Sequence, residues 1–320
     1  MNSSYSEILD YIKKNDNFLV VGHAMPDGDC MGSCLAFARI LKQLRKKYYI
    51  VNKNPIPVYL EFLLNEQKLI MPELIPTDYL VNAIFYLDCG DVARSNIDFS
   101  CYKEAVIINI DHHISNTGYG NLSLVQKNSS STGEVIFELF HKWIDFDCQT
   151  ATALYTAIET DTGSFKYANA SAQTMEIAAK LLKSGADKEL IRKNIYNKRS
   201  LTGIQAISIA LNSLQTDFEK GIAWLSISYE DKMKYGLQDE DYEGIVYYAN
   251  TIENIEVGVF FKENSPGNIK VSLRSNSTCD VNAFAQKFGG GGHLRAAGCN
   301  LAMSLLQAEE YLVNSLKEYM

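Results

Sequence analysis

Short apolar runs rich in β-branched residues alternate with helical patterns through the first half of the chain, and this alternation constrains the fold more than any other feature. The runs are largely apolar and do not alternate with polar residues, which is typical of strands buried on both faces. Strands that alternate with helices predict an α/β domain, with a parallel sheet and helices on both of its faces. The main strands are expected at 17–22, 48–51, 81–87 and 105–110, and the main helices at 30–44, 132–144, 149–160 and 172–183.

The second half of the chain carries a different pattern. Residues 187–197 and 201–214 predict consecutive helices with little strand character, which is typical of a connector. Strands and helices mix after them, and the turn at 265–268 predicts a hairpin. A length of 320 residues also favours two domains. We predict an α/β domain at 1–185, a helical linker at 186–216 and a smaller mixed α+β domain at 217–320, with the functional site in the cleft between the domains.

The charge balance limits the partners of the chain. Its 30 Lys and Arg residues face 38 Asp and Glu residues, and the formal net charge of −8 argues against a protein that holds long duplex nucleic acid. No apolar run reaches the ~18 residues that span a bilayer, and the first residues lack the pattern of a signal peptide. The 7 cysteines contain no C-x-x-C pair, which fits a reduced compartment. We expect a cytoplasmic protein without a membrane partner.

Ionisable side chains gather at the ends of predicted elements. Three of the four clusters follow predicted parallel strands, and open α/β sheets bind their ligands at the carboxyl ends of strands. Taken singly, each aspartate is also a common helix cap or turn residue. The Asp-His-His triplet is harder to explain structurally, because burial of three ionisable groups is costly unless they are paired or bind a metal. The clusters contain His23, Asp27, Asp29, Asp88, Asp111, His112, His113 and Asp161.

The composition of these clusters indicates a metal site. If Asp27, Asp29, Asp88 and Asp161 converge, their negative charges favour protonation unless cations neutralise them, and two divalent ions balance the count. Imidazole and carboxylate ligands without thiolates suit Mn²⁺ best, Mg²⁺ or iron less well, and structural zinc poorly.

A glycine run, 289–292, stands in the second half beside two basic side chains, His293 and Arg295. Gly290, Gly291 and Gly292 allow backbone N–H groups to approach an anion closely, and the basic residues add side-chain donors. The alternative for the glycines alone is a flexible loop. Arg274, in a predicted strand, is a candidate to bind a phosphate with its guanidinium fork, and its alternative is a solvated strand residue.

These motifs, in this order, resemble the DHH family of phosphoesterases, with a C-terminal DHHA1 domain around the glycine run. The resemblance implies one metal ion bound by His23, Asp27 and Asp88, and a second bound by Asp29, Asp88, His112 and Asp161. It also implies that His113 faces the substrate phosphate and that Asp111 orients a ligand from behind. Arg274 matches the phosphate-contacting arginine of the family. Arg94 either contacts substrate or makes a structural salt bridge.

The resemblance implies two-metal hydrolysis of a phosphoester. The two-domain layout resembles the branch that degrades short single-stranded RNA and removes the 3′-phosphate of 3′-phosphoadenosine 5′-phosphate (pAp), and this is the expected activity. Hydrolysis of cyclic di-AMP or linear dinucleotides is the first alternative, and a non-catalytic nucleotide sensor is the second. The sequence leaves the oligomeric state open, and a homodimer is one option.

Overall fold

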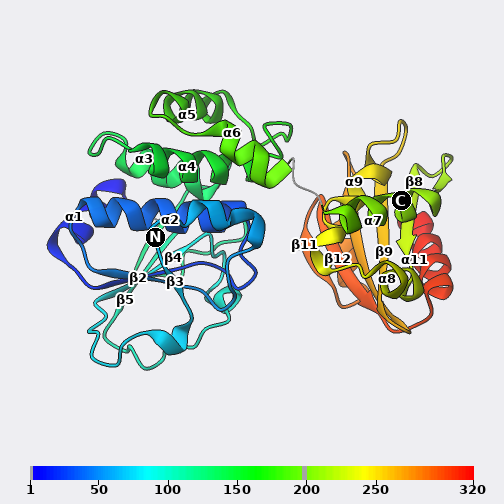
Figure 1. Cartoon of the computed structure of the whole chain (residues 1–320), viewed down its shortest axis with the longest axis horizontal. Coiled ribbons are helices and arrows are strands. Elements are labelled where there is room, and N and C mark those ends of the chain that lie inside the picture. Colours follow the sequence, from blue (N-terminus) through cyan, green and yellow to red (C-terminus); the bar gives the residue numbers. More distant parts are fainter. Residues whose placement is uncertain (1–2, 197–199) are drawn as a thin grey trace. The chain divides into compact units, whose positions relative to one another are not determined.

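The computed structural model describes residues 3–196 and 200–320, which form two compact units divided between residues 198 and 199 (Figure 1). The segment predicted as a linker is shared between them. Its first helix, α6 (Lys188–Ile191), continues into a π-helical turn, η4 (Arg192–Tyr196), in the first unit. Its second helix, α7 (Leu201–Asn212), belongs to the second unit.

The first unit contains a six-stranded parallel sheet with the order β3-β2-β1-β4-β5-β6. The predicted parallel sheet is therefore confirmed. Sequence patterns missed the two edge strands, because β3 has only two residues and a serine interrupts the apolar run of β6. The strands are β1 (Phe18–Val21), β2 (Tyr48–Val51), β3 (Leu69–Ile70), β4 (Ala83–Leu87), β5 (Val106–Asp111) and β6 (Leu122–Val125).

Both faces of this sheet are buried, one by helices and the other by loops and short 3₁₀ turns. The larger core lies between one face and the helices, which Figure 1 shows together on the same side of the strands. The sequence pattern predicted helices on both faces, and in this unit they cover one. Loops and 3₁₀ turns, including η2 (Pro72–Leu74) and η3 (Val92–Ser95), accompany a second apolar cluster on the opposite face. The helices are α1 (Tyr5–Lys14), α2 (Gly28–Gln43), α3 (Thr132–Phe140), α4 (Cys148–Asp161) and α5 (Ala172–Lys183).

Two glycines allow close packing between the helices that carry site residues. A Cβ atom at Gly32 would lie 2.5 Å from the carbonyl oxygen of Ala153, and one at Gly133 would lie 2.5 Å from the Cβ of Ala157. The backbones of α2 and α3 therefore approach α4 more closely than a larger residue permits. This approach brings the first turns of α2 and α3 to the carboxyl end of α4.

The second unit is built on a six-stranded mixed sheet with the order β11-β12-β10-β9-β8-β7. Its neighbouring strands are antiparallel except for the parallel pair β8 and β9. The predicted hairpin at 265–268 connects β9 to β10, as expected. Short polar or glycine-rich strands escaped prediction. The strands are β7 (Gln215–Asp217), β8 (Ile222–Ile227), β9 (Val257–Ser265), β10 (Asn268–Ser275), β11 (Gly291–His293) and β12 (Ala296–Leu301).

Helices cover the two faces of this second sheet unequally. One face packs along the sheet against α10 (Val281–Gln286) and α11 (Leu305–Tyr319). On the other face, α7 and α9 (Ile245–Asn250) pack on apolar residues of β8 and β9. The polar residues that β10 and β12 present on that face line an open pocket instead. A further helix, α8 (Tyr229–Tyr235), precedes α9. No helix in the described residues is both long and apolar enough to cross a membrane.

Candidate functional site

The carboxyl ends of adjacent strands bring the predicted residues of the first unit together. His23 follows β1, Asp88 follows β4, and Asp111 ends β5 directly before His112 and His113. Because β1, β4 and β5 are parallel neighbours, the loops after them meet at one edge of the sheet. Two further residues enter on helices, with Asp29 in the first turn of α2 and Asp161 at the last position of α4.

His112 lies at the centre of one group of acidic side chains. Its Nε2 atom is 3.7 Å from Oδ2 of Asp29, 3.6 Å from Oδ1 of Asp88 and 3.5 Å from Oδ2 of Asp161. Its Nδ1 atom faces the carbonyl oxygen of Ser129 at 3.4 Å. The imidazole therefore presents one nitrogen to three carboxylates and the other to the backbone, an arrangement typical of a metal-binding histidine.

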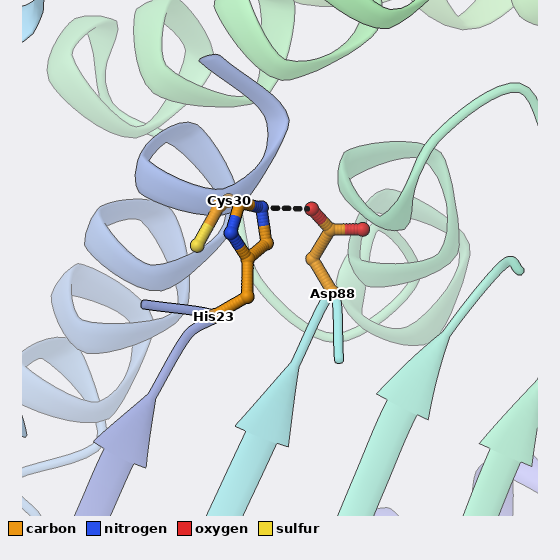
Figure 2. Close-up of side chains that lie close together, drawn as sticks. All are labelled: His23, Cys30 and Asp88. Atoms are coloured by element: carbon orange, nitrogen blue, oxygen red, sulfur yellow. Dashed lines mark ion pairs between the residues drawn. The ribbon is translucent and has the colours of Figure 1, made fainter. Parts of the chain in front are cut away.

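His23 belongs to a second group, which shares Asp88 with the first. Its Nε2 atom lies 3.5 Å from Oδ2 of Asp88 and 3.7 Å from Oδ1 of Asp27. Figure 2 shows the imidazole turned towards Asp88, with the sulfur of Cys30 on the other side of the ring. Burial raises the pKa of the Cys30 thiol well above its usual value. Its sulfur and ligand atoms of His23 and Asp88 lie within 4.8 Å of one another.

The N-terminus of α3 holds the carboxylate of Asp29. Its Oδ2 atom accepts the backbone N–H of Thr132 at 2.7 Å, and its Oδ1 atom accepts that of Gly133 at 3.0 Å. The hydroxyl of Thr132 also donates to Oδ1 of Asp88 at 3.1 Å. These N–H groups have no partner within the helix, and the helix dipole favours an anion at this end. The first turn of α3 thus fixes two of the acidic side chains.

Asp88 adopts a backbone conformation that most residues avoid. Its φ of 56° lies in the left-handed region, which Asp and Asn enter more readily than other non-glycine residues. The residue is also buried, with a side chain only 4% exposed. Backbone strain of this kind is concentrated at functional sites.

The carboxylates of the site repel one another. Burial raises the pKa of Asp29, Asp88 and Asp161, and for Asp88 and Asp161 the neighbouring carboxylates raise it further. Burial alone would lower the pKa of His23, but Asp27 and Cys30 raise it to about 10. Both effects show that this part of the fold favours added positive charge.

The donor set fits divalent cations. Ligand atoms of Asp29, His112 and Asp161 lie within 4.8 Å of one another. Donor atoms 3.5–3.7 Å apart can both contact an ion at about 2.0–2.2 Å from each. Carboxylate oxygens with imidazole nitrogens suit Mn²⁺ and related ions.

His113 lies beside the His112 group, with its ring centroid 4.8 Å from that of His112 and its Nδ1 atom 3.7 Å from Oδ1 of Asp88. It is held on both sides. Its Nδ1 atom lies 2.8 Å from Oδ1 of Asp111, and its Nε2 atom lies 2.9 Å from a guanidinium nitrogen of Arg94. Because a guanidinium only donates, Nε2 accepts and the ring proton resides on Nδ1, where it is donated to Asp111. Arg94 is exposed on η3, and its carbonyl oxygen accepts the N–H of Ala24.

A buried amide network behind Asp111 was not predicted. Asn116 donates to Oδ2 of Asp111 at 2.5 Å and to Oδ1 of Asn109 at 2.7 Å. Asn109 in turn donates to the carbonyl oxygen of Cys89 and towards the hydroxyl of Tyr119. Asn109 stands as a lone polar residue within the apolar run VIINI, and this interruption was the available signal. Nothing in the local sequence marked Thr132 or Ser129.

The remaining predicted residues lie in the second unit. Arg274, Gly290 and Gly291 line an open pocket of about 470 Å³ on the sheet. Arg274 lies over the ring of Tyr247, its guanidinium carbon 5.5 Å from the ring centroid. Its buried Nε atom has no hydrogen-bond partner among the described residues. His293 ends β11, and Arg295 is exposed in the turn before β12.

The glycine run leads into β11, which contains Gly291 and Gly292, and packs against the backbone of β12. A Cβ atom at Gly290 would overlap the carbonyl oxygen of Gly298 and would lie 2.6 Å from the Cβ of Cys299. Gly292 has a φ of 154°, and a Cβ atom there would lie 2.4 Å from the carbonyl oxygen of Ala296 and 2.6 Å from the Cα of Ala297. At Gly291 the nearest atom to an added Cβ is 3.8 Å away. Close strand pairing therefore requires Gly290 and Gly292, whereas Gly291 leaves the pocket open.

Comparisons with known proteins agree with this two-unit organisation. The model of the DHH family, N-terminal domain, matches residues 17–158, and that of the DHHA1 domain matches residues 231–320. The chain is 30% identical to the bifunctional oligoribonuclease and PAP phosphatase of Thermus thermophilus, over 93% of this chain and 89% of that protein. It is 29% identical to a probable enzyme of the same name from Streptococcus mutans, over 96% of each chain.

Solved structures show the same fold. An exopolyphosphatase-related protein from Bacteroides fragilis matches with a TM-score of 0.91 and 25% identity, over 98% of this chain and 96% of that chain. RecJ from Thermus thermophilus, in complex with Mn²⁺, matches with a TM-score of 0.52 and 14% identity, over 98% of this chain and 54% of that chain.

One curated relative bears on the alternative activity. The chain is 26% identical to a cyclic-di-AMP phosphodiesterase of Listeria monocytogenes, over 98% of this chain and 49% of that protein.

Proposed function

The chain belongs to the DHH family of metal-dependent phosphoesterases, with a C-terminal DHHA1 domain, and on that premise we propose that it hydrolyses short RNA oligonucleotides to 5′-mononucleotides and pAp to AMP and phosphate. The observation that carries the proposal is the convergence of three carboxylates on Nε2 of His112, next to the His23 group. Relatives that carry the names oligoribonuclease and PAP phosphatase over nearly the whole chain support the choice of substrate.

We propose two divalent cations as cofactors, with Mn²⁺ as the first choice and Mg²⁺ as an alternative. His23, Asp27 and Asp88 would hold one ion, and Asp29, Asp88, His112 and Asp161 would hold the other. When bound, the ions lower the pKa of a water molecule and offset negative charge on the phosphoryl group. Asp88 would serve both ions, since its two oxygens face the two histidines separately.

His113 and Arg94 would act on the substrate phosphate. Asp111 accepts a hydrogen bond from the Nδ1–H group of His113 and orients the imidazole, so that Nε2 can face a phosphoryl oxygen of the substrate. Arg94 is exposed beside that nitrogen and can turn its guanidinium to the same phosphate. In the second unit, Arg274, the backbone at Gly290, Gly291 and Gly292, and the side chains of His293 and Arg295 would hold the rest of the substrate.

Product analysis tests the proposal. End-labelled RNAs of two to about twenty-four nucleotides, a range that brackets the few nucleotides held by a compact site, are incubated with Mn²⁺, with and without EDTA, beside pAp and cyclic di-AMP. Rapid EDTA-sensitive release of mononucleotides from the shortest RNAs, with AMP from pAp, is the expected result. Reaction of cyclic di-AMP or dinucleotides alone would support the phosphodiesterase alternative. Nucleotide binding without turnover would support the sensor alternative.

Two further points belong to the proposal. The formal net charge of −8 disfavours long duplex nucleic acid as a substrate, and competition by duplex DNA in the same assay tests this. Homodimer formation is tested by sedimentation velocity of the full chain.

A further inference from the structure

The pocket on the second sheet has a second cationic end, away from Arg274. Along β10, Ile269, Val271 and Leu273 enter the core, whereas Lys270, Ser272 and Arg274 line the pocket on the opposite face. On β12, Asn300 pairs directly with Lys270, and Ala296 pairs with Arg274. One end of the pocket therefore carries Arg274, and the other carries Lys270 with Asn300.

Lys270 is available to a ligand, unlike the lysine beside it. Lys262, its partner on β9, makes an ion pair with Asp239 at 3.0 Å and lies over the ring of Tyr242. No carboxylate of the described residues lies within ion-pair distance of the ammonium of Lys270, which is exposed. The positive charge of Lys270 is thus not neutralised by a direct partner.

Small residues keep the pocket open between its two ends. Ser272 pairs with Gly298, and Gly298 pairs with Gly291 of the edge strand. A Cβ atom at Gly298 would lie 2.7 Å from the carbonyl oxygen of Val271, so a larger residue does not fit there. Lys270 and Arg274 are four residues apart on one strand, about 13 Å at 3.3 Å per residue. Strand side chains stand roughly perpendicular to the sheet, and the Arg274 guanidinium is held by the carbonyl oxygen of Leu273 and the ring of Tyr247. The two cationic groups therefore face separate parts of the pocket.

We propose that Lys270 and Asn300 form a subsite for a further phosphate and its nucleotide, used only by RNAs longer than a dinucleotide. The inference rests on the proposed function and adds to it a determinant of substrate length. Lysine contacts phosphate as a point charge without reading the base, and an asparagine amide can donate to a phosphate or a sugar oxygen. The subsite therefore adds affinity for chain length rather than for sequence.

Steady-state kinetics on substrates of different length test this subsite. The variants are Lys270→Ala, Asn300→Ala and, as rescue, Lys270→Arg, with pAp, a dinucleotide and a tetranucleotide as substrates. Loss of one charge-assisted contact is expected to raise KM for the tetranucleotide about tenfold. The KM for pAp and the dinucleotide, and kcat for all three substrates, are expected to stay unchanged. Lys270→Arg is expected to restore most of the loss, and the salt dependence of tetranucleotide binding is expected to weaken by about one phosphate contact in Lys270→Ala.

Lys220→Ala is the matched control, because it removes one exposed positive charge of the same unit outside the pocket. Thermal unfolding of each variant verifies that the fold is retained. An equal change in KM for all three substrates, or no change for the tetranucleotide while the wild type cleaves it, overturns the subsite alone. A wild-type protein that cleaves none of the substrates overturns the proposed function and the subsite together.

Discussion

The Nε2 atom of His112 lies 3.6 Å from Oδ1 of Asp88, although the two residues follow different strands. β4 and β5 are parallel neighbours, so the loops after them emerge side by side at the same edge of the sheet. The other oxygen of Asp88 faces His23. Asp88 thus connects the two groups of candidate ligands.

Replacement of Asp88 by asparagine is expected to abolish hydrolysis and keep the fold. The amide cannot supply the charge that two ions require, and a loss of about 10³-fold in kcat/KM follows if several kcal/mol of ion stabilisation are removed. Asparagine also tolerates the left-handed backbone at this position, where alanine costs about 1–2 kcal/mol. Turnover is measured with saturating Mn²⁺.

Thermal unfolding separates the ligand role of Asp88 from a structural one. Without added ions, Asp88→Asn is expected to be at least as stable as the wild type, because one of several mutually repelling carboxylates is removed. Addition of Mn²⁺ is expected to raise the Tm of the wild type and not that of the variant. Asp98→Asn, at an exposed carboxylate outside the site, serves as control. An equal rise in Tm for both proteins would contradict the shared-ligand assignment.

Replacement of Asp111 by asparagine is expected to lower kcat by about 10²-fold, the lower range for loss of a general acid or base. The Asp111 carboxylate accepts hydrogen bonds from both His113 and Asn116, whereas an amide has to turn its own N–H₂ group towards one of these donors. His113 then loses its fixed orientation or its tautomer. The affinity for Mn²⁺, measured by calorimetry, is expected to stay the same. A fall in Mn²⁺ affinity with an unchanged kcat would instead make Asp111 a ligand.

The glycine run provides a pair of variants, one expected to change the stability of the second unit and the other to change KM. Gly290→Ala is expected to destabilise the second unit by roughly 1–3 kcal/mol, because its Cβ meets the backbone of β12. Gly291→Ala is expected to leave Tm unchanged, since its Cβ has space, and to raise KM because the methyl group enters the pocket. Tm and KM of both variants are compared with the wild type. Unchanged KM in Gly291→Ala would remove this strand from the substrate site.

Glu256 is expected to contribute pH-dependent stability. Burial alone would raise the pKa of Glu256, but hydrogen bonds from Ser277, Thr278 and Cys279 lower it to about 2. A carboxylate with a lowered folded-state pKa stabilises the fold above its unfolded value of 4.5, and this contribution is lost as the pH falls towards about 2. Glu256→Gln is therefore expected to lower Tm by about 4 °C at pH 7, for a loss of about 1 kcal/mol.

The difference in Tm between Glu256→Gln and the wild type is expected to shrink between pH 4.5 and about 2. Glu253→Gln, three residues earlier and exposed, is expected to show no such difference. A difference in Tm that stays constant over this pH range would mean that Glu256 acts through packing rather than charge.

The parallel sheet could be predicted because its central strands are largely apolar runs between helices. The edge strands could not, because pairing with a neighbour rather than local composition determines them. β11 is the clearest case, since Gly291 and its neighbours have low intrinsic strand preference and become a strand only through pairing with β12.

Within the site, ionisable residues could be predicted from the sequence and uncharged polar residues could not. His23, Asp88 and the Asp-His-His triplet were predictable because ionisable groups after buried strands need a partner. Asn116 and Thr132 were not, because uncharged polar residues in loops are ordinary in sequence and acquire a role only from the groups they contact. The packing of α3 on α4 at Gly133, which brings Thr132 to Asp29, is likewise a tertiary property.

The alternation along β10 separates residues that pack in the core from residues that line the pocket within a single strand. Ile269, Val271 and Leu273 face the core, so substitutions there affect whether the unit folds. Lys270, Ser272 and Arg274 line the pocket, so substitutions there would alter the proposed substrate site and leave the core intact. Under the proposed function, ligand contacts can therefore vary at every second residue of this strand while the core packing stays the same.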